Sequence, residues 1–78
     1  MMAYVNFTNA RVLLTFTSPH SMNAWAYIET QPWRKVQPIS ADGVGNMFTL
    51  LNAAKAGGRT VSGSFDSGNN MLYTLYMN

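Results

Sequence analysis

The sequence predicts a small, mostly β domain in which three strands are followed by one helix and then by two more strands. The segment 44–56 repeats its apolar residues with the 3.6-residue period of a helix. The segments on either side are rich in β-branched and aromatic residues, and several alternate between apolar and polar. The chain has 78 residues and no cysteine. We therefore expect residues 1–78 to form a single domain whose stability comes from packing alone.

The first strand is predicted to be long and bent. Segments 3–7 and 11–17 both have strand composition, with Val12, Leu14 and Phe16 expected on one face of the second segment. Asn9 lies between the two segments, and asparagine tolerates unusual backbone angles at modest cost. We expect a β-bulge near Asn9 that bends one continuous strand.

Two shorter strands should follow. The cluster Ser-Pro-His-Ser at 18–21 predicts a turn, and segment 23–29 then alternates Trp25 and Tyr27 with alanine and isoleucine. This alternation places Trp25 and Tyr27 on one face, which we assign to the core. Segment 33–37 predicts a short third strand, and Pro38 confines it to an edge or ends it.

The helix at 44–56 has clear start and stop signals. Ser40 or Asp42 can cap its beginning, and Lys55 carries a positive charge in its last turn. Two glycines, Gly57 and Gly58, supply the left-handed conformation with which helices end.

The last two strands form a predicted hairpin over 60–66 and 71–77, joined by a polar turn. The second of these strands is apolar on both faces, so only one face can cover the core of its own domain. We assign the set Leu72, Thr74 and Tyr76 to an interface with a neighbouring subunit.

The composition also predicts self-association. Charged residues make up 10% of the chain, against roughly a quarter in ordinary globular proteins, while hydrophobic residues reach 47%. So few charges leave apolar surface that a subunit interface would bury. A homo-oligomer is therefore expected, and a domain of this size gains stability from such burial.

The residues give no support to an enzyme. The single histidine, His20, provides too few ligands for a transition-metal site, and no cofactor motif is found. The three acidic residues lie far apart in the sequence, and no nucleophile motif accompanies His20. A net charge of +2 from five bases is a weak basis for nucleic-acid binding. No apolar run is long enough to span a membrane.

Five strands with a helix between the third and the fourth match the element order of the OB-fold, a small Greek-key barrel. In addition, LLNAAKAGGRTV at 50–61 and LYTLY at 72–76 resemble the C-terminal half of the receptor-binding B subunits of pertussis-like and subtilase-type AB toxins. The resemblance implies a five-stranded OB-fold-like barrel that assembles into a homopentameric ring and binds glycans or a glycosylated receptor. It also implies secretion as a mature form and an A-type subunit as a candidate partner; without it, the expected location is the cytoplasm.

Glycan binding needs aromatic faces and hydrogen-bonding groups. Trp33, Arg34 and Lys35 place an apolar platform beside two cations, which suits an acidic sugar. Ser18 and His20 lie in a predicted loop that can also meet a ligand. Two residues of the last hairpin, Asp66 and Asn69, complete the candidate set.

Two other functions remain open. A nucleic-acid-binding OB module would stack bases on Trp25 and Tyr27 with Arg34 as its cation. A purely structural oligomer would use neither set of residues.

Overall fold

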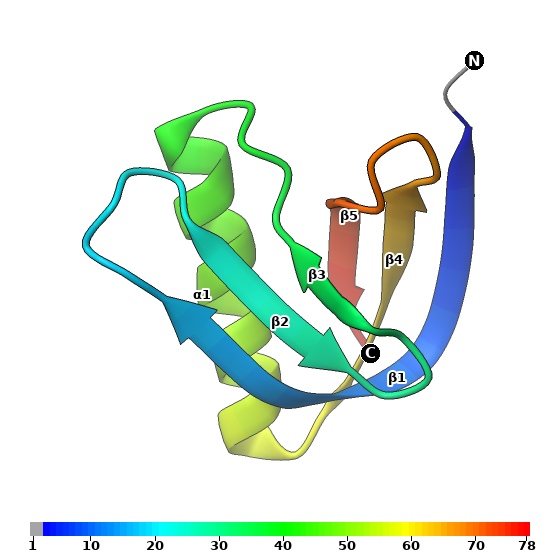
Figure 1. The fold of residues 1–78 in the computed structure, drawn as a ribbon. Coiled ribbons are helices and arrows are strands. Elements are labelled where there is room, and N and C mark those ends of the chain that lie inside the picture. Colours follow the sequence, from blue (N-terminus) through cyan, green and yellow to red (C-terminus); the bar gives the residue numbers. More distant parts are fainter. Residues whose placement is uncertain (1–2) are drawn as a thin grey trace.

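The computed structural model describes residues 3–78 as one five-stranded antiparallel sheet and one helix (Figure 1). The predicted element order of three strands, a helix and two strands is confirmed. The sheet order is β3-β2-β1-β4-β5, so the long first strand lies at its centre. The elements are β1 (Tyr4–Thr17), β2 (Ala24–Ile28), β3 (Trp33–Lys35), α1 (Ala41–Gly57), β4 (Thr60–Asp66) and β5 (Leu72–Met77).

Strand β1 is continuous and bent, as predicted. Its first part pairs with β4 and its second part with β2, and the register with β4 shifts between Phe7 and Ala10. Asn9 adopts a positive φ of 52° within this shift, and its backbone N donates to Ser62 Oγ at 3.0 Å. The bend lets one strand belong to both halves of the sheet (Figure 1).

A second irregularity in β1 changes which residues share a face. The register with β2 shifts between Val12 and Leu14, so Val12 is buried whereas Leu14 and Phe16 are exposed. The prediction that Val12, Leu14 and Phe16 lie on one face is wrong, because a bulge at Leu13 interrupts the alternation.

The five strands do not close into the predicted barrel. The two edge strands, β3 and β5, meet through a single parallel bridge between Val36 and Leu72, and Gln37 N donates to Leu72 O at 3.0 Å. Strand β3 has only three residues, and Pro38, which follows soon after it, has no N–H to extend the pairing. The sheet is therefore strongly curved but not closed into a barrel.

Helix α1 begins three residues before the predicted segment. Ser40 is its N-cap, and the side chain accepts a hydrogen bond from Gly43 N at 3.0 Å. Gly58 ends the helix in the left-handed conformation, with φ 65°. Both signals are present in the sequence, and the structure selects Ser40 rather than Asp42 as the cap.

The core lies between α1 and the concave side of the sheet. It contains one phenylalanine and otherwise small or aliphatic residues, which come from α1, from the segment after β3 and from every strand except β3: Phe7, Ala10, Val12, Ala24, Ala26, Ile28, Val36, Val44, Leu51, Ala54, Val61 and Leu72. In β2 the buried residues are the alanines and Ile28, so the prediction that Trp25 and Tyr27 enter the core is wrong. Trp25 is only partly buried and Tyr27 is exposed.

Strand β5 also contains an irregularity, which places the members of the predicted interface set on different sides of the sheet. Ser64 pairs with Thr74 and the next residue, Phe65, pairs with Leu72, which leaves Tyr73 as an extra residue. Leu72 consequently turns inward and is 0% exposed, whereas Thr74 and Tyr76 face outward. Leu72 belongs to the core, and Thr74 and Tyr76 are the outward members of the predicted set.

Within residues 3–78, no helix is both long and apolar enough to cross a membrane.

Candidate binding site

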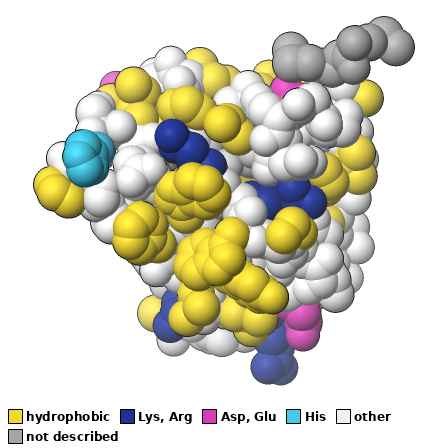
Figure 2. Space-filling model, in the orientation of Figure 1, with side chains coloured by type: hydrophobic (Ala, Val, Ile, Leu, Met, Phe, Trp, Pro, Cys, Tyr) yellow, Lys and Arg dark blue, Asp and Glu magenta, His cyan; other side chains and the backbone are white. Residues whose placement is uncertain are grey.

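Four aromatic side chains from three neighbouring strands gather on the convex side of the sheet. The register pairs Phe16 with Trp25 across β1 and β2, and Tyr27 with Trp33 across β2 and β3. Figure 2 shows hydrophobic side chains concentrated over β2 and β3. We call this surface the aromatic face and define it by six residues: Leu14, Phe16, Trp25, Tyr27, Trp33 and Lys35.

The aromatic face is open to solvent and hollowed. Phe16 is 50% and Trp33 42% exposed. The rings of Tyr27 and Trp33 meet edge to face, with their centroids 5.6 Å apart and an interplanar angle of 82°. A cavity of about 480 Å³ lies on this face and is lined by Phe16, Asn23, Trp25 and Trp33. Exposed aromatic residues around a shallow cavity are a feature of ligand-binding surfaces.

The β1–β2 loop supplies the polar rim of this cavity. Trp25 Nε1 donates to Asn23 Oδ1 at 2.9 Å, and Asn23 Nδ2 donates to Ser18 Oγ at 2.7 Å. Ser18 Oγ in turn lies 2.9 Å from His20 Nδ1. Two predicted site residues, Ser18 and His20, are thus linked to the aromatic face through Asn23.

Two predicted site residues on β3 lie on the aromatic face. Trp33 pairs with Tyr27, and Lys35 pairs with Trp25. Lys35 is the only charged member of the aromatic face. Its ammonium group can attract an anionic substituent of a ligand that stacks on the neighbouring rings.

Arg34, a predicted ligand contact, is placed differently from its neighbours Trp33 and Lys35. Strand alternation turns it to the other side of the sheet, where it is 6% exposed. Its Nη2 and Nε donate to Gln31 Oε1 at 2.8 and 3.1 Å, and its Nη1 donates to Asn70 O at 3.1 Å. The guanidinium lies 3.6 Å from the centroid of the Phe65 ring, and burial lowers the pKa of Arg34. All of these contacts are structural.

The predicted hairpin residues also have structural roles. Asp66 is 0% exposed, and its Oδ1 accepts from Gly68 N at 2.8 Å. Asn69 Oδ1 accepts from Met71 N at 3.0 Å. Both side chains hold the β4–β5 turn, with Asp66 buried and Asn69 exposed.

Sequence reasoning leaves three residues of the cavity out of the predicted glycan site: Phe16 and Asn23 are missed, and Trp25 is assigned to the core. Simple alternation assigns Phe16 to the same face as the core residue Val12, and only the bulge between them separates the two. For Asn23 a weak signal exists, because an asparagine just before a strand commonly fixes a turn. Its bond to the Trp25 indole follows from the three-dimensional path of the loop.

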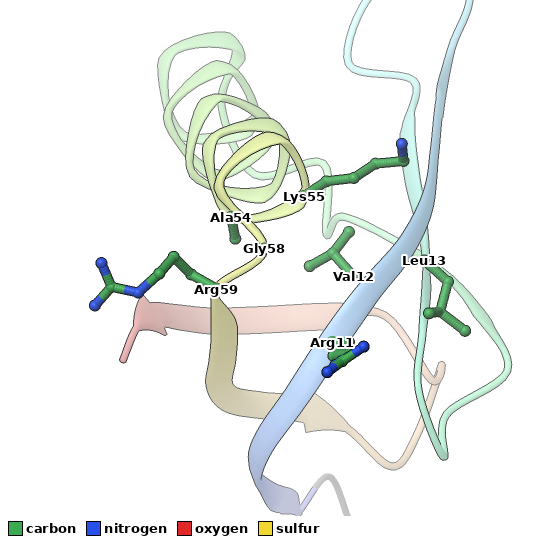
Figure 3. Close-up of a pocket in the computed structure, with 7 residues that line it drawn as sticks. All are labelled: Arg11, Val12, Leu13, Ala54, Lys55, Gly58 and Arg59. Atoms are coloured by element: carbon green, nitrogen blue, oxygen red, sulfur yellow. The ribbon is translucent and has the colours of Figure 1, made fainter.

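A second cavity lies at the C-terminal end of α1. It measures about 360 Å³ and is lined by Arg11, Val12, Leu13, Ala54, Lys55, Gly58 and Arg59. Figure 3 shows the Lys55 side chain extending toward β1, whereas that of Arg59 points away from the cavity. An Arg59 Nη2 bond to Asn78 O holds that guanidinium. The three cationic groups therefore do not converge on one point.

The remaining convex surface, over β4, has a different character. We call it the tyrosine face and define it by Tyr4, Asn6, Tyr73, Thr74 and Tyr76. Tyr4 and Tyr73 stack with centroids 4.4 Å apart. The Tyr73 hydroxyl, followed by loss of solvation and by the charges of Tyr73 and Asp66, raises the pKa of Tyr4. A cavity of about 230 Å³ lies beside Asn6, Thr74 and Tyr76.

No group of three or more His, Asp or Glu side chains within residues 3–78 is arranged to hold a metal ion. Comparison of the chain with models of protein families, with curated proteins and with solved structures found no significant match.

Proposed function

We propose that this chain is a non-enzymatic binding subunit that recognises the saccharides of a glycan or a glycosylated receptor on its aromatic face. The observation that carries the proposal is the aromatic cavity itself, in which Phe16, Trp25 and Trp33 surround about 480 Å³ at the surface. Sugar rings present flat C–H surfaces that pack on aromatic rings, and their hydroxyl groups need neutral hydrogen-bonding partners.

Lys35 favours an acidic sugar. It is the cation of the aromatic face and lies across the strands from Trp25, whereas Arg34 is committed to Gln31 and Asn70. Of the three acidic residues, Asp66 is buried in the hairpin, Asp42 lies in the first turn of α1 and Glu29 follows the end of β2. A carboxylate on the ligand would therefore gain attraction from Lys35 without an acidic neighbour on the aromatic face.

The fold also supports a place near the OB-fold, as an open variant of that barrel. Its order of elements and the parallel bridge between the edge strands at Val36 and Leu72 are the supporting features. On this proposal the chain is related to the B subunits of pertussis-like and subtilase-type toxins. It would then be secreted, with an A-type subunit as a candidate partner.

We further propose that the chain acts as a homo-oligomer, in the first place a pentamer. The tyrosine face supports this because it exposes apolar rings, with Tyr76 and Thr74 on the outward side of an edge strand. Tyrosine is enriched in the buried parts of protein interfaces. A ring of equivalent sites would raise the avidity for a multivalent receptor by on the order of a hundredfold.

Binding is tested with an array of neutral and acidic oligosaccharides, and the affinity of each variant is then measured by titration in solution with the strongest ligand as a monovalent oligosaccharide, which does not depend on avidity. We expect Trp33→Ala to weaken binding by about tenfold, since a stacked ring contributes roughly 1–1.5 kcal/mol. Tyr76→Ala is the matched control, because it removes an exposed ring from the tyrosine face. It should leave the affinity of a single site unchanged. Failure of every saccharide to bind, or equal loss in both variants, would overturn the proposal.

Assembly is tested by mass measurement under native conditions. A pentamer of 8.6 kDa subunits has a mass of about 43 kDa. Tyr76→Ala should dissociate it while Trp33→Ala leaves it intact. A monomer at micromolar concentration would contradict the oligomer proposal without touching the binding proposal.

A nucleic-acid-binding function is the second candidate, because bases also stack on exposed aromatic rings that follow neighbouring strands. The aromatic face offers one cation, Lys35, where single-strand binders line their groove with several. Retention of single-stranded DNA with a steep dependence on salt, together with no saccharide binding, would favour this candidate.

A further inference from the structure

We infer that Asn23 positions Trp25 for its ligand and that protonation of His20 loosens this hold, so that binding on the aromatic face weakens as the pH falls. The inference rests on the proposed binding function for its consequence, but its physical basis is a set of hydrogen bonds that can be tested without any ligand. Four side chains form this set: His20, Ser18, Asn23 and Trp25.

The bonds form an unbroken path from the only histidine of the chain to the cavity. Trp25 Nε1 lies 2.9 Å from Asn23 Oδ1, Asn23 Nδ2 lies 2.7 Å from Ser18 Oγ, and Ser18 Oγ lies 2.9 Å from His20 Nδ1. Thr17 Oγ1 also donates to the backbone carbonyl of Asn23 at 2.9 Å, which anchors that residue. Figure 2 shows the histidine at the margin of the same face.

The directions of these bonds follow from the chemistry of the groups. An indole N–H can only donate, so Asn23 must turn its oxygen toward Trp25 and its amide nitrogen toward Ser18. Ser18 Oγ then accepts from Asn23, which leaves the hydroxyl proton available for His20 Nδ1. We assign neutral His20 the tautomer with its proton on Nε2, because Nδ1 can then accept the Ser18 hydroxyl proton while the two lone pairs of Ser18 Oγ accept from Asn23 Nδ2 and His20 N.

Protonation of His20 reverses the last bond. Nδ1 becomes a donor, so Ser18 Oγ has to accept from the imidazolium as well as from Asn23 Nδ2 and from His20 N, which lies 3.4 Å away. Two lone pairs then face three donors. The bond to the charged imidazolium is the strongest of the three, and the neutral amide of Asn23 competes with it poorly. Asn23 is then held less firmly, and so is the indole of Trp25.

Other ionisable groups on the surrounding elements provide controls. Lys35 on β3 and Tyr27 on β2 share the convex side of the sheet, and Asp42 lies in the first turn of α1. None of the three takes part in the path of bonds from His20 to Trp25. Histidine is the side chain whose charge ordinarily changes between pH 5 and 8.

The first experiment uses fluorescence, because the chain has only two tryptophans. Trp33→Phe leaves Trp25 as the sole emitter. In this background we expect the Trp25 emission to shift in one step between pH 8 and pH 5. His20→Gln retains a hydrogen-bonding side chain without a titrating charge, and Ser18→Ala removes the bridging hydroxyl; each should abolish the step. Asp42→Asn and Lys35→Gln should preserve it.

Asn23→Ala provides the reference for a released indole. Its emission at pH 8 should match that of the Trp33→Phe parent at pH 5, with unchanged far-ultraviolet circular dichroism. The inference is overturned if the parent shows no step, if the step persists in His20→Gln, or if Asp42→Asn or Lys35→Gln removes it.

The second experiment measures binding of the strongest saccharide from the array by the otherwise unaltered chain. We expect about threefold weaker binding at pH 5 than at pH 8, which corresponds to the loss of one ordinary hydrogen bond. His20→Gln should bind equally at both pH values. A fluorescence step without any saccharide binding would contradict the proposed function and leave the coupling between His20 and Trp25 intact. Saccharide binding without the step would do the opposite.

Discussion

The two halves of the convex surface belong to the same sheet and both expose large rings, but the rings pack differently in each half. On the aromatic face, Trp33 stays open to solvent and its edge-to-face contact with Tyr27 leaves ring surface free. On the tyrosine face, Tyr4 and Tyr73 stack with an interplanar angle of 21°. They lie beside a row of small polar residues on β4 that are buried although they point outward: Ser62, Ser64 and Asp66.

The difference arises from the side chains that β2 and β4 place on the outer side of the sheet. Strand β2 presents Trp25 and Tyr27 outward, because its small residues Ala24 and Ala26 occupy the crowded inner side. Strand β4 presents short side chains outward, and the longer residues of β1 and β5 close over them. On the aromatic face large residues on adjacent strands therefore contact one another edge to face, whereas on the tyrosine face Tyr4 and Tyr73 stack beside the short side chains of β4.

The largest expected effect is a loss of stability from a substitution under the tyrosine face. A Cβ at Gly63 would collide with the carbonyl oxygen of Thr74 on the neighbouring strand. We expect Gly63→Ala to lower the free energy of unfolding by about 2–3 kcal/mol, because the two backbones must move apart. Urea denaturation measures this loss.

Gly45→Ala is the matched control for this substitution. Gly45 lies within α1, and a methyl group added there would extend into open space. Alanine at this position should raise stability by about 0.5–1 kcal/mol. A Gly63→Ala protein as stable as wild type would show that β4 and β5 do not need their close approach.

A smaller effect is expected at Arg34, which connects β3 with the β4–β5 hairpin. Arg34 on β3 reaches the β4–β5 hairpin through Asn70 O and the Phe65 ring. Arg34→Met keeps an unbranched apolar side chain but removes the guanidinium, which leaves Gln31 Oε1 and Asn70 O without their donor. We expect a loss of about 1–2 kcal/mol in unfolding free energy and an unchanged saccharide affinity of the folded protein.

Trp33→Ala should give the reverse pattern, with weaker binding and a smaller change in stability. If Arg34→Met instead abolished binding while the unfolding free energy stayed at the wild-type value, the arginine would be a ligand contact after all.

The smallest expected effect is on the pKa of Tyr4, which stacks on Tyr73. Because Tyr73 raises the pKa of Tyr4, the neutral form of Tyr4 is favoured in the folded protein. The stability that this raised pKa of Tyr4 contributes is present below the ordinary tyrosine pKa of about 10. It is lost as the pH rises through the higher pKa that Tyr4 has in the folded protein. Tyr73→Phe should keep the stack and lower the pKa of Tyr4 toward its ordinary value. Ultraviolet titration of tyrosinate would detect the change, and an unaltered titration curve would contradict it.

Most of the secondary structure can be predicted because its signals are local. The helix caps, the bend at Asn9 and the hairpin at 67–70 each follow from the residues that occupy them. The candidate site can be predicted only in part. Trp33 and Lys35 lie on the aromatic face and Ser18 and His20 are linked to it, whereas Arg34 and Asp66 are buried. Strand alternation correctly groups the residues of β2 by side, but it cannot say which side faces the core.

The sequence by itself determined the order of the elements, where the helix begins and ends, and the position of the main bend, since each depends on the conformational preferences of a few consecutive residues. The tertiary structure alone decided which side of each strand is exposed. Single-residue bulges near Leu13 and Tyr73 change the face of every residue beyond them. For that reason Phe16 joins the aromatic face, Leu72 joins the core, and Asn23 meets the indole of Trp25 only in the folded chain.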